Sequence, residues 1–282
     1  MEKISFRLYR EYGALNSVPI FDAVSRGLKA VGFQEVTANE DIPVIWSVLW
    51  LGRMAGNRSV YMSAKSMNKP VLIIEVGNLK RNITWRVSID NINGHGYFAN
   101  EENLDINRCQ TLGVQLREPC KNRNEKILIA SQHENSLQWQ YQPPASEWLE
   151  QTINEIRRFT DRRIVVRHHP RWPLKAVPNG VQIEKPVKLA NSYDDFNINY
   201  AYHVVINHNS GPAVQAAING SPIICDSSSL AYPVSDQMIH IENPSLVDRQ
   251  EWFLRLCHTE WTVEEIANGI PFNRLKSKIA SY

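Results

Sequence analysis

The sequence predicts an α/β protein made of two Rossmann-like lobes that face a central cleft. Short apolar runs alternate with amphipathic stretches along the chain, which favours parallel sheets covered by helices. Residues 202–226 alone show the order strand, polar turn, helix, glycine and second strand. The length of 282 residues suits two such lobes. We expect an N-terminal lobe over 1–125, a C-terminal lobe over 126–260, and a C-terminal helix over 261–282 that packs back on the first lobe.

The first lobe is predicted to begin with a strand at 4–9 and a helix at 19–31. Pro19 suits the first turn of that helix, and Gly32 suits the position just after its end. The further elements are a buried strand at 43–51, a turn at 52–57, a helix around Tyr61, Ala64 and Met67, a buried strand at 71–76, and an alternating strand at 84–90.

The charged stretch 120–125 separates the lobes. The second lobe is predicted to contain strands at 126–130, 163–167 and 181–183, a helix at 146–159 with Ser146 as its N-cap, and then the unit 202–226. Segments 245–257 and 262–279 have the pattern of helices.

The composition points to a globular protein of the cytoplasm. Hydrophobic residues make up 43% of the chain and charged residues 21%. No segment approaches the ~20 apolar residues that cross a bilayer, and the N-terminus lacks the apolar core of a signal peptide. The four cysteines form no CxxC pair, which favours reduced thiols. We therefore expect no membrane partner, metal ion or resident cofactor.

Cations concentrate in two segments, 53–86 and 157–175, although the formal net charge is only +2. Such segments indicate anionic ligands at a localised surface. The alternative is that each segment forms a solvated helix face.

Polar side chains follow four predicted strands of the second lobe, where ligands of parallel sheets bind. The candidates are Ser131 and Gln132 after the first strand, Arg167, His169 and Arg171 after the second, Ser210 and Gly211 after the third, and Asp226 after the fourth. A guanidinium binds phosphate oxygens bidentately, and an imidazole can donate one further hydrogen bond. The alternative for Arg167 and His169 is structural bonding at a strand end.

The polar turn 207–212 precedes a helix, so its N–H groups and the Ser210 hydroxyl suit a phosphate. Gln215, one helical turn further on, is expected to reach ribose hydroxyls. The alternative is a tight turn whose small residues serve packing only.

A general base is expected in the first lobe. Glu75 follows a buried strand, and a partly buried carboxylate can accept a proton from a hydroxyl. Asp90, His95 and Asp22 are competing candidates. A salt bridge is the structural alternative for Glu75.

One pattern of the second lobe resembles a known family. His169-Pro170, followed by Ser210…Gln215-Ala216-Ala217…Gly220-Ser221-Pro222-Ile223, is similar to the donor lobe of two-lobed (GT-B fold) glycosyltransferases, and above all to capsule-polysaccharide transferases. The resemblance covers about residues 126–230, and Gln215 stands where that family usually has glutamate.

This resemblance implies a nucleotide-sugar donor, for which we expect UDP, and a metal-independent inverting displacement with Glu75 or Asp90 as base. The donor would be held by Ser131, Gln132, Arg167, His169, Arg171, Ser210, Gly211 and Gln215.

The first lobe is similar to short bacteriophage proteins that glycosylate modified bases in viral DNA. The residues concerned are Trp46…Trp50, Lys69-Pro70 and Thr84-Trp85-Arg86-Val87. This similarity implies a 5-hydroxymethylpyrimidine in double-stranded DNA as acceptor, in the host cytoplasm, with phosphate contacts from Arg53, Arg58, Arg81 and Arg86. A saccharide acceptor, a nucleotide-sugar 2-epimerase and a non-catalytic nucleic-acid-binding protein are the alternatives.

Overall fold

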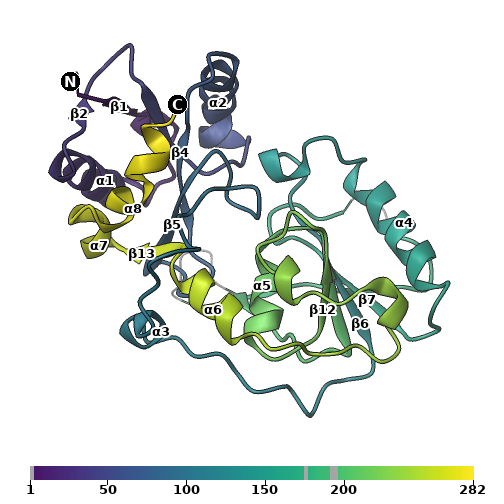
Figure 1. Cartoon of the computed structure of the whole chain (residues 1–282). Helices are drawn as coiled ribbons and strands as arrows, with labels where there is room; N and C mark the ends of the chain where they lie inside the picture. Colours follow the sequence, from purple (N-terminus) through teal and green to yellow (C-terminus); the bar gives the residue numbers. More distant parts are fainter. Residues whose placement is uncertain (1–2, 175–176, 191–195) are drawn as a thin grey trace. The chain divides into compact units, whose positions relative to one another are not determined.

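The computed structural model describes residues 3–174, 177–190 and 196–282, which form two compact units (Figure 1). The first unit comprises Met1–Arg108, Asn135–Leu137 and Arg255–Tyr282, and the second comprises Cys109–Glu134 and Gln138–Leu254. Each unit contains a sheet with helices, so the predicted α/β class with Rossmann-like units is confirmed. The units differ in extent from the lobes predicted at 1–125, 126–260 and 261–282. Lys175, the last cation of the predicted basic segment, lies outside the described residues.

The sheet of the first unit has six strands in the order β13-β5-β4-β3-β1-β2. The strands are β1 Ser5–Leu8, β2 Gln34–Glu35, β3 Ile42–Trp46, β4 Leu72–Val76, β5 Thr84–Ile89 and β13 Glu260–Thr262. The first four are parallel to their neighbours, but β5 is antiparallel to β4, with Leu72 opposite Ile89 and Val76 opposite Trp85. The fully parallel sheet that we predicted is therefore wrong at this edge, because the connection between β4 and β5 is too short for a crossover.

Strand β3 ends earlier than predicted. The predicted strand at 43–51 stops at Trp46, because Ser47 adopts a left-handed backbone with φ 62°. The predicted turn at 52–57 is a 3-10 helix, Gly52–Ala55, that leads directly into helix α2, Gly56–Ser66.

Three helices of the first unit pack together on one another. Helix α1, Val18–Ala30, buries an apolar face against the sheet and ends before Gly32, whose φ of 97° fits the predicted helix end. Helices α7, Val263–Ala267, and α8, Ile270–Ile279, lie beside α1 (Figure 1). A β-carbon on Gly27 of α1 would lie 1.9 Å from the Ile266 carbonyl, so glycine permits this close approach.

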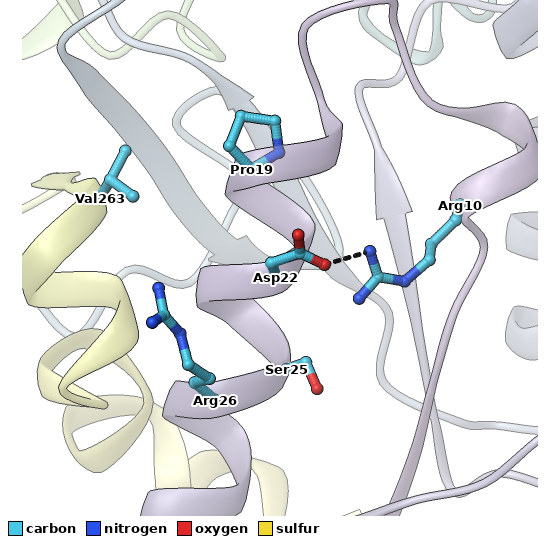
Figure 2. Close-up of a pocket in the computed structure, with 6 residues that line it drawn as sticks. All are labelled: Arg10, Pro19, Asp22, Ser25, Arg26 and Val263. Carbon is cyan, nitrogen blue, oxygen red and sulfur yellow. Dashed lines mark hydrogen bonds and ion pairs between the residues drawn. The ribbon is translucent and has the colours of Figure 1, made fainter.

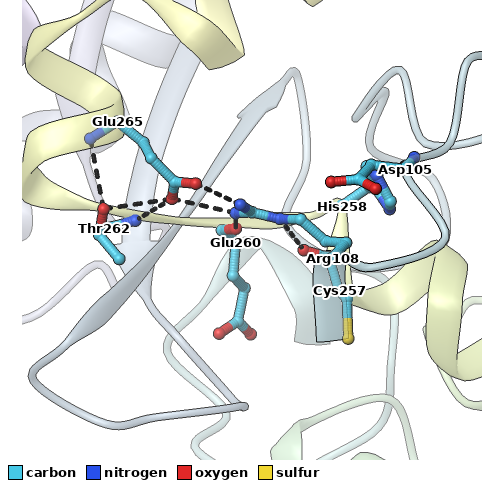
Figure 3. A network of polar contacts seen from close by, with 7 residues as sticks. All are labelled: Asp105, Arg108, Cys257, His258, Glu260, Thr262 and Glu265. Carbon is cyan, nitrogen blue, oxygen red and sulfur yellow. Dashed lines mark hydrogen bonds and ion pairs between the residues drawn. The ribbon is translucent and has the colours of Figure 1, made fainter. Parts of the chain in front are cut away.

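A polar network attaches the C-terminal segment to the first unit (Figure 3). The Arg108 guanidinium donates from Nε to the Cys257 carbonyl at 3.1 Å and from Nη2 to the Glu260 carbonyl at 2.6 Å, and it forms an ion pair with Glu265. Glu265 also completes a capping box with Thr262 at the start of α7. These contacts explain why β13, which the sequence pattern did not reveal, joins the first sheet beside β5.

The second unit has a five-stranded parallel sheet in the order β12-β11-β6-β7-β8. Its strands are β6 Ile127–Ala130, β7 Ile164–Arg167, β8 Gln182–Glu184, β11 Val204–Asn207 and β12 Ile223–Cys225, and its helices include α4 Ala145–Ile156 and α5 Gly211–Ile218. The order predicted for 202–226 is therefore observed. A short antiparallel pair, β9 Val187–Lys188 and β10 Phe196–Asn197, lies outside this sheet.

Helix α4 begins differently from the prediction. Its N-cap is Pro144 rather than Ser146, and the Ala145 amide donates to the Glu134 carboxylate at 2.8 Å. Two further helices, α3 Arg108–Thr111 and α6 Gln250–Cys257, contain points where the chain passes from one unit to the other. Among the described residues, no helix is both long and apolar enough to cross a membrane.

Candidate functional site

The turn between β11 and α5 places backbone donors at a helix start that has no side-chain cap. Ser210 is the N-cap of α5, and its side chain makes no capping hydrogen bond. Instead, Asn207 holds Ser210: the Ser210 amide donates to Asn207 Oδ1 at 2.8 Å, and Asn207 Nδ2 donates to Ser210 Oγ at 3.0 Å. Pro212 has no N–H, so Gly211 and Ala213 supply the first-turn N–H groups that have no partner within the helix. This turn can therefore accept an anion at a positive helix end.

His169 lies at the neighbouring end of β7, where two backbone contacts orient it. Its amide donates to Ser131 Oγ at 2.9 Å, which joins the ends of β6 and β7. Its ring Nδ1 accepts a hydrogen bond from the Arg171 amide at 3.2 Å. In the neutral ring the proton must therefore be on Nε2, which makes Nε2 a hydrogen-bond donor. Arg171 itself is exposed.

His133 also lies beside His169, although the sequence predicted no role for it. It is buried, with ring centroids 5.4 Å from His169 and 4.5 Å from Trp172. Burial, together with the nearby Arg171 charge, lowers the pKa of His133 to about 4. His133 is therefore a neutral ring at neutral pH, in edge-on contact with His169.

Most contacts of Arg167 are structural, and the donor contact predicted for it stays a prediction. Its side chain is 4% exposed, and it forms an ion pair with Glu184 at 2.7 Å. It also donates from Nη2 to the Asn199 carbonyl at 2.6 Å and lies over the Tyr200 ring at 5.2 Å. Glu184 thus neutralises the guanidinium through Nε and Nη2, where a phosphate would have to compete with a carboxylate, while the buried Nη1 has no hydrogen-bond partner among the described residues.

Gln132 is also structural. Its Nε2 donates to Asn209 Oδ1 at 2.9 Å, and its Oε1 accepts from the Asn209 amide at 3.1 Å. Both residues are at most 5% exposed. This pair fixes the end of β6 to the β11–α5 turn, so Gln132 is not available to a donor. Four of the predicted donor-binding residues lie near one edge of the sheet: His169, Arg171, Ser210 and Gly211. Ser131 accepts the hydrogen bond of the His169 amide, and Gln215 lies on the second turn of α5.

In the first unit, Glu75 lies at the carboxyl end of β4. Its Oε2 accepts from Ser47 Oγ at 2.6 Å, and its Oε1 accepts from the Val76 amide at 2.8 Å. The side chain is half-buried, and no ion pair involves it within the described part of the chain. The described residues therefore provide no salt bridge to Glu75, which was the structural alternative, and Glu75 stays the candidate base.

The position of Asp90 argues against the prediction that it is the general base. Because β5 runs antiparallel to β4, Asp90 lies beside Val71 at the amino end of the parallel strands, opposite to the end that carries Glu75. Its carboxylate pairs with Lys65 at 2.7 Å and accepts from the Tyr282 hydroxyl. Asp90 is thus part of a structural cluster. His95, in the turn after β5, is exposed.

The predicted DNA-contacting arginines divide into two kinds. Arg86 is buried, and its guanidinium donates to the carbonyls of Val76 and Ile92, so the phosphate contact predicted for it is wrong. In the same segment Lys65 pairs with Asp90, as described above, and Lys69 Nζ donates to the Glu40 carbonyl. Some cations of this segment are therefore engaged in structural contacts. Arg53, Arg58 and Arg81 are exposed.

A surface hollow of about 500 Å³ lies on the first unit, and Glu75 is not among the residues that line it (Figure 2). The residues that line it are Arg10, Pro19, Asp22, Ser25, Arg26 and Val263. Within it, Asp22 pairs with Arg10 at 2.7 Å, which neutralises the carboxylate. Asp22 is therefore a poor candidate for the general base.

The fold is that of GT-B glycosyltransferases. The β-Kdo 2,7 transferase KpsC of Thermosulfurimonas dismutans superposes with a TM-score of 0.53 at 13% identity, covering 98% of this chain and 100% of its own. The β-Kdo 2,4 transferase KpsC of the same organism gives 0.51 at 10% identity, covering 96% and 99%. At these identities the similarity shows a shared fold, as the second-unit pattern predicted.

AviGT4, a glycosyltransferase involved in avilamycin A biosynthesis, matches with a TM-score of 0.36, which is too low to support an argument. No protein-family model matches the sequence, and no curated protein matches it either. The similarity to phage DNA-base glycosyltransferases gains no support from these comparisons.

Proposed function

We propose that this protein is a glycosyltransferase that moves a sugar from a nucleotide-activated donor to a hydroxyl group of a saccharide. The observation that carries the proposal is the β11–α5 turn, whose first-turn N–H groups lie at an uncapped helix start near His169, in a chain that shares the fold of the Kdo transferase KpsC over 98% of its length. The fold is common to many chemistries, so the residues at this edge carry the functional argument.

In this proposal the second unit binds the phosphate of the donor. The amides of Gly211 and Ala213 and the Nε2–H of His169 donate to its oxygens, and the exposed Arg171 adds a positive charge. The sugar–phosphate C–O bond breaks, and the nucleotide leaves with the bonding electron pair. Because these donors already neutralise the charge that develops on the leaving group, no acid is needed to protonate it.

The acceptor hydroxyl oxygen attacks the anomeric carbon from the opposite side in a single displacement, which inverts the configuration. The hydroxyl proton passes to the Glu75 carboxylate. This carboxylate accepts two hydrogen bonds and pairs with no cation among the described residues, which suits it to this step.

A saccharide is favoured over DNA as the acceptor because the cation-rich segment 53–86 does not form one continuous surface. Three of its cations, Lys65, Lys69 and Arg86, are engaged in structural contacts. A DNA acceptor would require phosphate contacts along the duplex. The modified pyrimidine in DNA therefore becomes the second candidate acceptor, and UDP remains the predicted nucleotide.

The test is to incubate the purified protein with uridine, guanosine, thymidine and cytidine nucleotide sugars, each with saccharide acceptors and with 5-hydroxymethylpyrimidine DNA. Products are then weighed by mass spectrometry. We expect a saccharide that gains one sugar. Detection of a glycosylated nucleoside would instead identify DNA as the acceptor. Epimerisation of the donor without any acceptor, or no turnover of any donor, would contradict the proposal.

A further inference from the structure

Ser47, which directly follows β3, combines burial with an unusual backbone. It is 5% exposed and has a φ of 62°, in the left-handed region that non-glycine residues seldom adopt. Its amide nevertheless donates to the Ile74 carbonyl at 2.8 Å, so it continues the contact between β3 and β4. Strained residues of this kind persist where the surrounding structure holds them, and they cluster at functional sites.

The side chain of Ser47 is directed at Glu75. The register pairs Trp46 with Ile74, which places the following residues Ser47 and Glu75 side by side. The Leu49 amide donates to Ser47 Oγ at 3.2 Å, and Oγ lies 2.6 Å from Glu75 Oε2. A hydroxyl has one hydrogen to donate. Because Leu49 donates into the oxygen, the hydroxyl hydrogen is directed at the carboxylate.

We propose that Ser47 is a positioning residue for the general base Glu75, an inference that rests on the proposed function. The Ser47 hydroxyl holds Oε2 and the Val76 amide holds Oε1, so the carboxylate has one orientation. Ser47 keeps its own proton throughout the reaction, and the proton of the acceptor hydroxyl goes to a remaining lone pair of Glu75.

The test compares two substitutions at Ser47 with a matched control. Ser47→Ala removes the hydroxyl but keeps a β-carbon, and Ser47→Gly removes the hydroxyl and suits the positive φ. If the hydroxyl matters, both variants lose activity, whereas a purely conformational role would spare Ser47→Gly. The control is Ser25→Ala, because Ser25 Oγ donates to Glu35 Oε2 at the same 2.6 Å and Ser25 is similarly buried.

Sugar-transfer rates are measured as kcat and KM, with thermal melts to verify folding and with titrations of the bare nucleotide. We expect both Ser47 variants to lower kcat roughly tenfold, because the carboxylate loses its fixed orientation. Nucleotide affinity should stay unchanged, and Ser25→Ala should match the wild type.

The outcomes distinguish this inference from the proposed function. An active wild type and an inactive Glu75→Gln, together with a Ser47→Ala variant of normal kcat, would overturn the inference alone. Full activity in Ser47→Gly would do the same. Full activity in the Glu75→Gln variant would show that Glu75 is not the general base, and it would overturn the inference as well. A wild type that turns over no donor would overturn the proposed function, and the inference with it.

Discussion

Replacing Arg167 by alanine should destabilise the protein rather than weaken donor binding. Its side chain is 4% exposed and forms an ion pair with Glu184 at 2.7 Å, with further contacts to Asn199 and Tyr200. Breaking a buried pair costs about 3–5 kcal/mol. Glu184 is 33% exposed, so water can solvate it after the arginine is lost. We therefore expect a loss near the low end, about 3 kcal/mol.

For a unit of this size, such a loss corresponds to a melting temperature roughly 6–12 °C lower. The measurement is thermal and urea denaturation of the wild type and of Arg167→Ala, followed by calorimetric titration with a nucleotide at a temperature where both are folded. We expect the affinities to agree within about twofold. The stability control is Arg171→Ala, because Arg171 is exposed. An Arg167→Ala variant of normal stability that no longer binds nucleotide would refute this reasoning.

Three further predictions follow from described contacts. Arg171→Ala should weaken nucleotide affinity about tenfold with an unchanged melt, and its binding should depend less on salt; equal affinities by calorimetry would contradict this. Burial lowers the pKa of His133 from 6.5 to about 4, so the unfolded chain takes up a proton there first. Lowering the pH from about 6.5 to 4 should therefore reduce the free energy of unfolding of the wild type by up to ~1.4 kcal/mol per pH unit. The His133→Gln variant should lose less stability over the same range. Urea denaturation at each pH measures both. Gly77→Ala should cost about 1–3 kcal/mol by the same method, because its β-carbon would lie 2.3 Å from Glu260 Oε2; an unchanged midpoint would be inconsistent with this contact.

The sequence predicted most of the elements because apolar periodicity is a local property. The unit 202–226 is the best example, since its strands, its helix and the left-handed Gly220 all occur where the pattern places them. The direction of β5 was not predictable in this way. An alternating strand has the same pattern in either direction, and only its partner decides which one is adopted.

The candidate site was predicted in part. His169 and Ser210 were found because polar residues after buried strands meet at one edge of a parallel sheet. His133 was not assigned a role, since a histidine after a strand has no pattern that marks it as buried against Trp172. Ser47 was also missed, because a positive φ at serine leaves no signal in the sequence.

The sequence by itself thus determined the α/β class, most of the strands and helices, and the polar edge of the second sheet. Only the tertiary structure decided what each polar residue at that edge contacts. Arg167 and His169 stand two residues apart and looked equivalent in the chain, yet Glu184 engages the first, while backbone contacts orient the second. The physical reason is that a buried charge must be paired, and its partner comes from another strand whose position no local pattern specifies.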